Sequence, residues 1–460
     1  MSLAGPLGRD ALACPDKPAR WPLRAWINPL IFSTSTGHQR HPASVYPKTW
    51  EVLGTMFDFT PLLAKDLPPA AGKWGGYPEV NFVGGHNARE AIPVEALIEG
   101  VTNQLRRIGS ELATYNMEGG PQGFLPLREI MATKMTHDRG APTTADQVLI
   151  TSGSLQGLDL VNTLLVDRGD TVIIEESSYG GMFSKLARRG ANIIGAPLDG
   201  DGLRLDALDQ ILGDLAAKDV TPKYIFTIPT VQNPTGSVMP LDRREGLLRL
   251  AQSHSVPIFE DECYADLVWS GDRPPALRGL DQTGSVIHIG SFSKNLAPAL
   301  RLGYLVADWP VMSRILPLKG DAGTNALSQM VVAEYFGQHY DAHIAGLLPR
   351  LEAKAAAMVD AVAREFGTAA EFTTPKGGIF LWIRIPGVDT SALFQTATAE
   401  GVHFNAGADW SWAGADAGDC LRLCFALPSE DEIRSGVARL AEICRRETGI
   451  PERSGNVAHT

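Results

Sequence analysis

The protein has 460 residues, of which 44% are hydrophobic and 20% are charged. This composition is typical of a globular protein with a sizeable core, and the length suggests two or three structural units. The formal net charge is -11, which gives the chain no general attraction to phosphate backbones or anionic lipid. We therefore expect neither nucleic acid nor membrane surfaces as partners, although the average charge leaves room for a local basic pocket.

The five cysteines include no CxxC pair, and an odd number in so long a chain does not indicate a disulfide framework. Cys420 and Cys424 lie in the strand-like segment CLRLC, where we expect two small core residues. A reducing compartment fits best, and no metal site is expected. Arg9, Asp10 and Asp16 interrupt the N-terminal segment where a signal peptide needs an apolar stretch. No run approaches the roughly 20 apolar residues of a membrane helix, so we expect a cytoplasmic protein.

Residues 1–75 are rich in Pro and Trp and show weak periodicity, and Pro68-Pro69 with the following Ala70-Ala71-Gly72 is typical of a linker. We interpret 1–75 as an N-terminal extension, which either lies on a partner subunit or is partly disordered. Residues 76–118 are interpreted as an N-terminal arm that also contributes to a small domain.

From about residue 119, short apolar and β-branched runs alternate with amphipathic segments. Strands that alternate with helices indicate crossover connections and a mostly parallel sheet that is buried on both faces. We therefore predict an α/β domain over 119–345. Its predicted strands are 147–153, 171–176, 192–198, 224–229, 257–261, 286–291 and 301–307, and its predicted helices are 155–166, 180–189, 204–218 and 241–254.

The rhythm changes again beyond about residue 345, and residues 346–460 are interpreted as a separate, smaller α+β domain. Ser429 with Glu432 three residues later has the spacing of a capping box, which predicts the start of the last helix. The other predicted elements are a helix over 347–367, a strand at 377–385, a helix near 390–400 and a strand at 420–426.

Ligands of an open parallel sheet bind beyond the carboxyl ends of its strands. Polar residues follow four of the predicted strands, namely Ser152-Gly153-Ser154, Asn233-Pro234-Thr235-Gly236, Asp261, and Ser291-Phe292-Ser293-Lys294. A lysine beside a buried strand end can have a lowered pKa, which Schiff-base chemistry requires. An isolated lysine would be an ordinary surface residue, but Lys294 is accompanied by Arg301 and by hydroxyl groups that suit a dianionic phosphate.

Asp261 closes an otherwise apolar strand, where an unpaired carboxylate is costly. This carboxylate could cap a helix or pair with Arg243 or Arg244, or it could be held against a cationic ring nitrogen. Tyr264 would point a phenol into the same space. Asn233 lies in an Asn-Pro-x-Gly stretch that is by itself an ordinary turn.

Taken together, these residues point to one cofactor. Pyridoxal phosphate needs a lysine for its aldehyde, an anion for its pyridinium nitrogen, donors for its ring oxygen and an anion cradle for its phosphate. A helix that begins at Ser154 would add backbone amides to that cradle. The chain supplies the required groups in the order Ser154, Asn233, Asp261, Tyr264, Ser291, Ser293, Lys294 and Arg301.

The segments NPTG (233–236), DECY (261–264) and SFSKNLAPALRLGY (291–304) resemble fold-type I pyridoxal-phosphate-dependent aminotransferases of class I/II. The similarity is greatest to the branch that includes kynurenine/α-aminoadipate-type and bacterial broad-specificity enzymes. Segments 113–132 and 150–181 resemble the same family, and the match runs from about 80 to 445. The resemblance implies a large cofactor-binding domain with a mostly parallel sheet and a smaller α+β domain.

The resemblance implies that Lys294 forms the internal aldimine and shuttles a proton between the substrate Cα and the cofactor C4′. Asp261 would keep the pyridinium protonated, and Asn233 and Tyr264 would bond the ring 3′-oxygen. Tyr179 would stack on the ring. The phosphate would be held by Ser154, the Leu155 amide, Ser291, Ser293 and Arg301.

The implied substrates are an L-amino acid and a 2-oxo acid. Arg422 matches the arginine that forks the substrate α-carboxylate, in preference to a strand-edge arginine on the surface, and Asn233, Gly85 and His86 would also contact the substrate. Tyr115 would reach the phosphate of the neighbouring subunit, which implies a homodimer with shared active sites.

Four features depart from the family pattern, and one of them is the long N-terminal extension with Trp21, Trp26 and Trp50. Leu155 stands where this branch usually has a polar Gln, and His86 stands where relatives usually have an apolar residue. Asn405-Ala406-Gly407 with Trp410 replaces the usual Pro-Gly-x-x-Phe. These changes indicate an unusual substrate or an altered reaction outcome, although loop drift explains each one equally well.

Transamination is the main functional hypothesis. A second hypothesis is an elimination, replacement, cyclisation or decarboxylation on the same cofactor. A third is a transcription regulator with an aminotransferase-like domain, which would need a basic, helical DNA-binding head. Residues 1–75 contain few Lys or Arg clusters and abundant Pro, which disfavours that hypothesis.

Overall fold

The computed structural model describes residues 57–64, 67, 70–412 and 416–452. The chain divides into two units, Met1–Leu67 and Pro68–Thr460. The described part of the first unit contains the short 3-10 helix η1 (Thr60–Leu62). The extension predicted over 1–75 therefore lies mostly outside the described residues.

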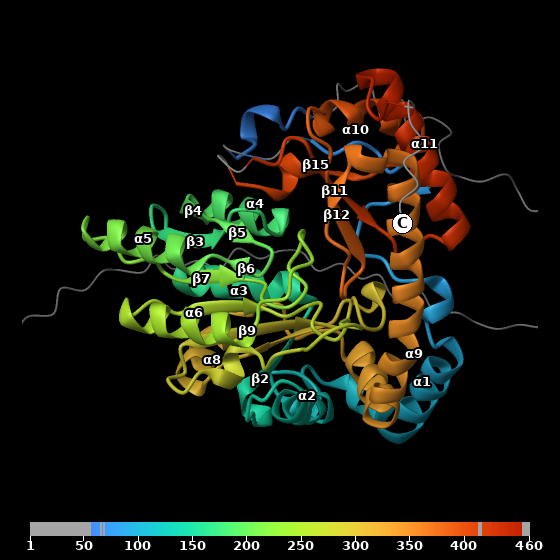
Figure 1. Ribbon diagram of the computed structural model, residues 1–460. Helices are drawn as coiled ribbons and strands as arrows, with labels where there is room; N and C mark the ends of the chain where they lie inside the picture. The colour runs from blue at the N-terminus through green and yellow to red at the C-terminus, as the bar shows by residue number, and fades with distance from the viewer. Residues whose placement is uncertain (1–56, 65–66, 68–69, 413–415, 453–460) are drawn as a thin grey trace, which may run out of the picture. The chain divides into compact units, whose positions relative to one another are not determined.

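The second unit is built on a seven-stranded sheet with the strand order β2-β10-β9-β8-β7-β3-β4 (Figure 1). Strand β10 is antiparallel to both of its neighbours, and the other adjacent pairs are parallel. Its seven strands confirm the predicted α/β pattern. They are β2 (Val148–Thr151), β3 (Thr171–Glu175), β4 (Asn192–Ala196), β7 (Ile225–Thr227), β8 (Ile258–Asp261), β9 (Val286–Ser291) and β10 (Gly303–Val306).

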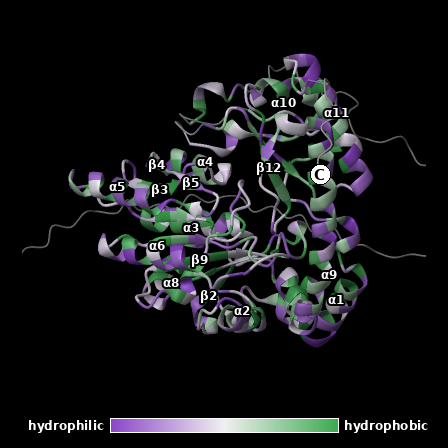
Figure 2. Cartoon of the chain, viewed as in Figure 1, coloured by the Kyte–Doolittle hydropathy of each residue, from purple (hydrophilic) through white to green (hydrophobic). Residues whose placement is uncertain are grey.

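Helices cover both faces of this sheet, because its strands are apolar on both sides. One face packs under α3, α4 and α8, and the other packs under α5, α6 and α7. The strands are accordingly mostly green in the hydropathy view of Figure 2. The helices are α3 (Ser154–Leu165), α4 (Gly180–Arg189), α5 (Leu205–Ala216), α6 (Leu241–Ser253), α7 (Leu277–Leu280) and α8 (Trp309–Ile315).

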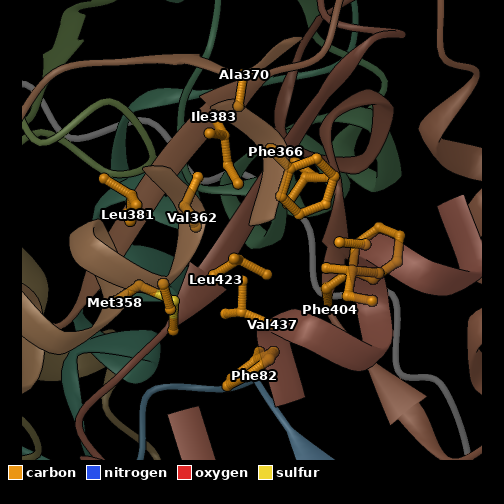
Figure 3. Close-up of a cluster of buried hydrophobic side chains, with 14 of the residues drawn as sticks. Phe82, Met358, Val362, Phe366, Ala370, Leu381, Ile383, Phe404, Leu423 and Val437 are labelled. Atoms are coloured by element: carbon orange, nitrogen blue, oxygen red, sulfur yellow. The ribbon is translucent and has the colours of Figure 1, made fainter. Parts of the chain in front are cut away.

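The C-terminal part of the chain forms a four-stranded antiparallel sheet in the order β11-β12-β15-β14. Side chains from this sheet and from α9, α10 and α11 pack into one hydrophobic core, drawn in Figure 3. Each aliphatic side chain buried there contributes roughly 1.5–3 kcal/mol to folding. The elements are β11 (Glu371–Phe372), β12 (Phe380–Arg384), β14 (Asn405–Ala406), β15 (Cys420–Cys424), α10 (Thr390–Ala399) and α11 (Glu430–Thr448).

The last helix begins as predicted, with both hydrogen bonds of the capping box between Ser429 and Glu432 formed. Cys420 and Cys424 are buried at the two ends of β15, and both are free thiols. The sequence therefore predicted correctly both the start of the last helix at Ser429 and the burial of Cys420 and Cys424.

The predicted start of the helix over 347–367 is wrong. Helix α9 (Ala326–Phe366) is 41 residues long and begins at a cap in which the Asn325 side chain accepts from the Ser328 amide. Pro349 lies inside it, at a position where a proline usually ends or kinks a helix. Burial of residues such as Met330, Val332 and Phe336 against the large domain holds the first half of the helix in place.

Near the start of the second unit the chain forms a two-stranded sheet that is separate from the four-stranded one. Strand β1 (Val80–Asn81) pairs in parallel with β13 (Val402–His403), and Phe82 is then buried in the C-terminal core. This anchor fixes where the following residues, Gly84 to His86, lie. Helices α1 (Val94–Ile108) and α2 (Leu125–Asp138) follow and pack against α9.

Among the residues that the structure describes, no helix combines the length and the apolar character needed to cross a membrane.

Candidate active site

The candidate site lies at the carboxyl ends of the parallel strands. Strands β3, β7, β8 and β9 run in the same direction, so their carboxyl ends meet at one edge of the sheet. Asp261 is the last residue of β8 and Ser291 the last of β9. Lys294 follows three residues after β9, and Tyr264 follows three residues after β8.

Lys294 carries the amine on which the predicted chemistry depends. Its Nζ donates a hydrogen bond to the Gly85 carbonyl at 2.9 Å and lies 5.9 Å from the centre of the Tyr264 ring. Burial lowers the pKa of Lys294, and the nearby cations Arg422 and Arg301 lower it further, whereas two neighbouring thiols act in the opposite direction. A lysine with a lowered pKa has more of its amine in the neutral, nucleophilic form.

Asp261 is a buried carboxylate with an amide partner. Its Oδ1 accepts from the Cys263 amide at 3.0 Å, and burial raises the pKa of Asp261. Neither arginine considered as an ion-pair partner reaches it, because Arg243 pairs with Asp199 and Arg244 with Glu262. A buried carboxylate of this kind is stabilised when a cation is brought to it.

An anion cradle surrounds the N-terminus of α3. Gly153 precedes this helix with a φ of +75°, and a Cβ at this position would overlap the Arg301 guanidinium. Arg301 itself adopts a left-handed conformation and donates from Nη1 to the Pro298 carbonyl at 3.0 Å. Ser291 and Ser293 are both buried, and the Ser293 amide donates to Ser291 Oγ at 3.1 Å. Ser154 and Leu155 open the helix, so the five residues predicted to hold a phosphate occupy neighbouring parts of the fold.

Arg422 lies within the small sheet and not at its surface. It is only 3% exposed, between β12 and β14, which excludes the alternative of a surface arginine. Its Nη1 donates to Asn233 Oδ1 at 2.7 Å and its Nη2 to Asn405 Oδ1 at 2.8 Å. The guanidinium carbon lies 3.6 Å from the centre of the Trp410 ring.

The predicted substrate loop lies against the reactive amine. Besides accepting from Lys294, Gly85 approaches so closely that a Cβ there would overlap Nζ. His86 is half-buried, and its pKa is lowered by burial and by the charge of Lys294. The Tyr77 ring stands edge-on to His86 at 5.6 Å between ring centres, and Trp74 stands edge-on to Tyr77 at 5.2 Å.

Tyr179 and Tyr264 are both largely buried, and burial raises the pKa of each phenol. The Tyr264 ring packs edge-on against Phe380 at 5.2 Å. Tyr115 is different, because it is 84% exposed and makes no contact with the other site residues that the structure describes.

Sequence reasoning missed a buried carboxylate, Glu175, at the end of β3. Its side chain accepts from Thr227 Oγ1 at 2.6 Å, from the Ile228 amide at 3.0 Å and from Gln232 Nε2 at 2.9 Å. Burial raises the pKa of Glu175 to about 7, against the effect of these hydrogen bonds, and Asp261 adds to the rise. Glu175 could have been found by the argument used for Asp261, since it too closes an apolar strand.

Gln232 was missed as well, because the adjoining Asn-Pro-Thr-Gly turn drew attention to Asn233 alone. Its Nε2 also donates to the Ser177 carbonyl at 2.7 Å, while its Oε1 accepts from the Thr235 amide at 2.8 Å. Glu175 and Gln232 thereby connect the segment before Tyr179 to the turn that carries Asn233.

These residues fit pyridoxal phosphate. A buried carboxylate without a cationic partner among the described residues suits a pyridinium nitrogen, and a buried amine of lowered pKa suits an aldehyde. A cradle of hydroxyls, an arginine and a helix N-terminus suits the phosphate.

The model of the family "Aminotransferase class I and II" matches residues 93–440. The chain belongs to this family. It is 32% identical over 372 residues to aromatic-amino-acid aminotransferase 1 of Thermococcus litoralis, an alignment that covers 80% of this chain and 88% of the relative. The protein is therefore a pyridoxal-phosphate-dependent aminotransferase with the fold-type I architecture.

A solved structure supports the same cofactor. The α-aminoadipate aminotransferase LysN of Thermus thermophilus, complexed with N-(5'-phosphopyridoxyl)-L-leucine, is 32% identical and superposes with a TM-score of 0.74 over 80% of this chain and 92% of that one. A relative with another name is the uncharacterized HTH-type transcriptional regulator YdfD of Bacillus subtilis, which is 30% identical over 361 residues, 77% of this chain and 72% of the relative. The class I and II aminotransferase similarity thus extends to proteins named as regulators.

Proposed function

We propose that this aminotransferase moves the amino group of an L-amino acid to a 2-oxo acid with Lys294 as the group that attaches the cofactor and moves the proton. When bound, pyridoxal phosphate supplies the aldehyde that receives the amino group and the ring that withdraws electrons from the substrate Cα. Lys294 Nζ takes the proton from Cα. The single observation that supports this role best is the burial of Lys294 with a lowered pKa, 2.9 Å from the Gly85 carbonyl.

The remaining cofactor contacts follow from the site. We propose that Asp261 keeps the ring nitrogen protonated, that Tyr264 and Asn233 bind the ring oxygen, and that Tyr179 stacks on the ring. Asp261 is suited to its role because its buried carboxylate accepts from the Cys263 amide and forms no ion pair among the described residues. The phosphate contacts proposed are Ser154, the Leu155 amide, Ser291, Ser293 and Arg301.

Arg422 is proposed to bind the substrate α-carboxylate, with Asn233 beside it. A guanidinium presents parallel N–H groups that match a carboxylate in geometry and in charge. Gly85 and His86 are proposed to line the space for the substrate side chain. Because burial and Lys294 both disfavour the charged form of His86, that space favours an uncharged side chain at neutral pH.

The neighbouring aromatic rings support an aromatic amino donor. Tyr77 and Trp74 are 62% and 76% exposed, and their edge-on contacts connect His86 to the surface. Edge-on contacts of this kind are favourable between aromatic rings. The Thermococcus litoralis relative is itself named for aromatic amino acids.

We also propose that the enzyme is a cytoplasmic homodimer in which Tyr115 completes the phosphate site of the partner subunit. Tyr115 is 84% exposed, which is unusual for a tyrosine unless something else contacts it. Helix α1 and the segment that follows it also expose Val94, Ile98, Leu105 and Leu112. An apolar surface of this kind next to Tyr115 suits a subunit interface.

The test is the substitution Lys294→Ala in the cofactor-loaded enzyme. Cofactor should still bind but should no longer be fixed to the protein by borohydride, and turnover should fall below detection. Lys185→Ala is the control, because Lys185 lies on α4 and pairs with Asp159 instead. Turnover retained by Lys294→Ala would contradict the proposal.

The reaction outcome is measured separately. After mixing with an amino acid alone, a transaminating enzyme leaves the cofactor in its amine form and releases a 2-oxo acid. An eliminating enzyme restores the original spectrum and releases ammonia. Release of ammonia in step with turnover would replace transamination with elimination.

A further inference from the structure

Arg422 is restrained on three sides. Its two terminal nitrogens each donate to a carboxamide oxygen, that of Asn233 at 2.7 Å and that of Asn405 at 2.8 Å. The Trp410 ring covers one face of the guanidinium at 3.6 Å, within the distance at which a cation and an aromatic face attract each other. Because Arg422 is 3% exposed and Trp410 is 8% exposed, water screens these contacts little.

Trp410 is itself anchored from both ends of its segment. It ends the short helix η9 (Gly407–Trp410), and the Ser178 amide donates to its carbonyl at 2.9 Å. At the other end Gly407 packs so tightly that a Cβ there would overlap the Ala417 carbonyl. These contacts fix the backbone that carries the indole, whose ring lies 5.8 Å from the Tyr179 ring and 3.6 Å from the Arg422 guanidinium carbon.

Asn405 is placed by the register of the small sheet. In the antiparallel pair of β14 and β15, Asn405 is the direct partner of Arg422. Directly opposed side chains in such a pair lie about 4.5–5.5 Å apart at Cβ, so the carboxamide reaches the guanidinium without reorganising. Asn405 and Trp410 occupy the segment in which this chain departs from the usual Pro-Gly-x-x-Phe of its family.

We infer that Trp410 and Asn405 are positioning residues that hold the Arg422 guanidinium rigid, so that the site selects substrates by their α-carboxylate. A free arginine side chain loses considerable rotational freedom when it binds a carboxylate, whereas one already fixed does not. The contacts to Trp410 and Asn405 leave further N–H groups of Arg422 for the substrate, since a guanidinium has five donors. The inference rests on the proposed role of Arg422 and adds the residues that make it selective.

The test compares each amino acid with the amine that lacks its carboxylate. The two probe pairs are L-phenylalanine with 2-phenylethylamine and L-alanine with ethylamine, and the signal is the absorbance of the cofactor in the loaded enzyme. The discrimination ratio is kcat/KM for the amino acid divided by kcat/KM for the amine. In Trp410→Leu this ratio should fall by roughly ten- to thirtyfold, which corresponds to the loss of one desolvated cation–π contact.

Most of the fall in the discrimination ratio should come from a higher KM for the amino acid, and the cofactor spectrum should be unchanged. Trp410→Phe retains an aromatic face and should recover part of the ratio. Asn405→Ala removes one carboxamide and should lower the ratio severalfold, which keeps the inference testable if Trp410→Leu fails to fold. The control is Trp412→Phe, because Trp412 stacks on Phe183 at 5.7 Å and makes no described contact with Arg422.

Two results would overturn the inference. If Trp410→Leu slows the amino acid and the amine by the same factor, Trp410 has only a structural role. If KM for the amino acid is unchanged in both Trp410→Leu and Asn405→Ala, Arg422 does not need them. If the unmodified enzyme reacts with neither probe pair, the proposed transamination fails instead, so the two failures are distinguishable.

Discussion

The charged groups at the two ends of the active site have contrasting surroundings. At the cofactor end, formed by Lys294 and Asp261, burial disfavours both charges, and neither group has an ion-pair partner among the described residues. At the carboxylate end, formed by Arg422 with Asn233, Asn405 and Trp410, the guanidinium has neutral partners on three sides. The groups proposed to move a proton or to meet a charged ring therefore lack an ion-pair partner, whereas the group proposed to orient the substrate is held by neutral side chains.

The largest effect is expected from replacing Asp261 at the cofactor end of the site. In Asp261→Asn the anion proposed to face the ring nitrogen is lost, so kcat should fall by on the order of 10²–10³-fold. KM should change little, because the contacts of Arg422 are untouched. Steady-state kinetics on the loaded enzyme measures both constants, with the exposed Asp272→Asn as control. A higher KM with unchanged kcat would contradict the division between the two ends.

A second carboxylate at the cofactor end should make stability depend on pH. The pKa of Glu175 is raised from 4.5 to about 7 in the folded protein, so between these values the folded state holds a proton that the unfolded state releases. The free energy of unfolding must then fall as pH rises from about 4.5 to 7. Glu175→Gln cannot ionise and should lose this dependence.

The difference between the wild-type and Glu175→Gln proteins should therefore shift by up to about 3 kcal/mol in favour of the variant across that range. Urea unfolding of the cofactor-free proteins at several pH values measures this shift. Thr230→Val provides a comparison, because Thr230 donates to Glu262 and not to Glu175. A constant difference between wild type and variant at all pH values would show that folding does not raise the pKa of Glu175.

The two ends also differ in how well the sequence predicted them. Lys294, Asp261 and Arg301 lie beside strand ends of one parallel sheet, and strand periodicity together with family motifs located them. Trp410 covers the Arg422 guanidinium because η9 packs beside β15. No local sequence pattern predicts this packing. The family resemblance does single out this segment, because Asn405 and Trp410 depart from the expected Pro-Gly-x-x-Phe, but it does not predict the contact with Arg422.

The elements of the fold also differ in how well the sequence predicted them. Each strand of the large sheet was predicted to within a few residues, because apolar runs bounded by turns are local signals. The first half of α9 was not predicted, since its helical pattern is interrupted by polar and aromatic residues and Pro349 follows. Tertiary packing against the large domain overrides those local signals. Tyr115 could be assigned only through the family resemblance, because its proposed partner is another subunit.

A smaller effect is expected where the substrate loop contacts the reactive amine. In Gly85→Ala the new Cβ would overlap Lys294 Nζ and displace the amine from the Gly85 carbonyl. Displacements of this size cost roughly ten- to a hundredfold in rate, so kcat should fall by about tenfold or more. Stopped-flow absorbance of the amino-acid half-reaction measures the step. Gly72→Ala is the control because its Cβ would meet nothing within 4 Å, and an unchanged rate in Gly85→Ala would place the amine elsewhere during the reaction.

The smallest expected effect comes from a variant that should lower the stability of the C-terminal core without changing the contacts of Arg422. Ser429→Ala removes the side-chain cap of α11, a helix that packs in the same hydrophobic core as β15. Loss of such a cap costs about 1 kcal/mol. Because Arg422 is held by Asn233, Asn405 and Trp410 and not by α11, this variant should unfold at lower urea concentration with the same discrimination between amino acid and amine. If the discrimination falls with stability, selectivity at Arg422 comes from the rigidity of the whole C-terminal core and not from Asn233, Asn405 and Trp410.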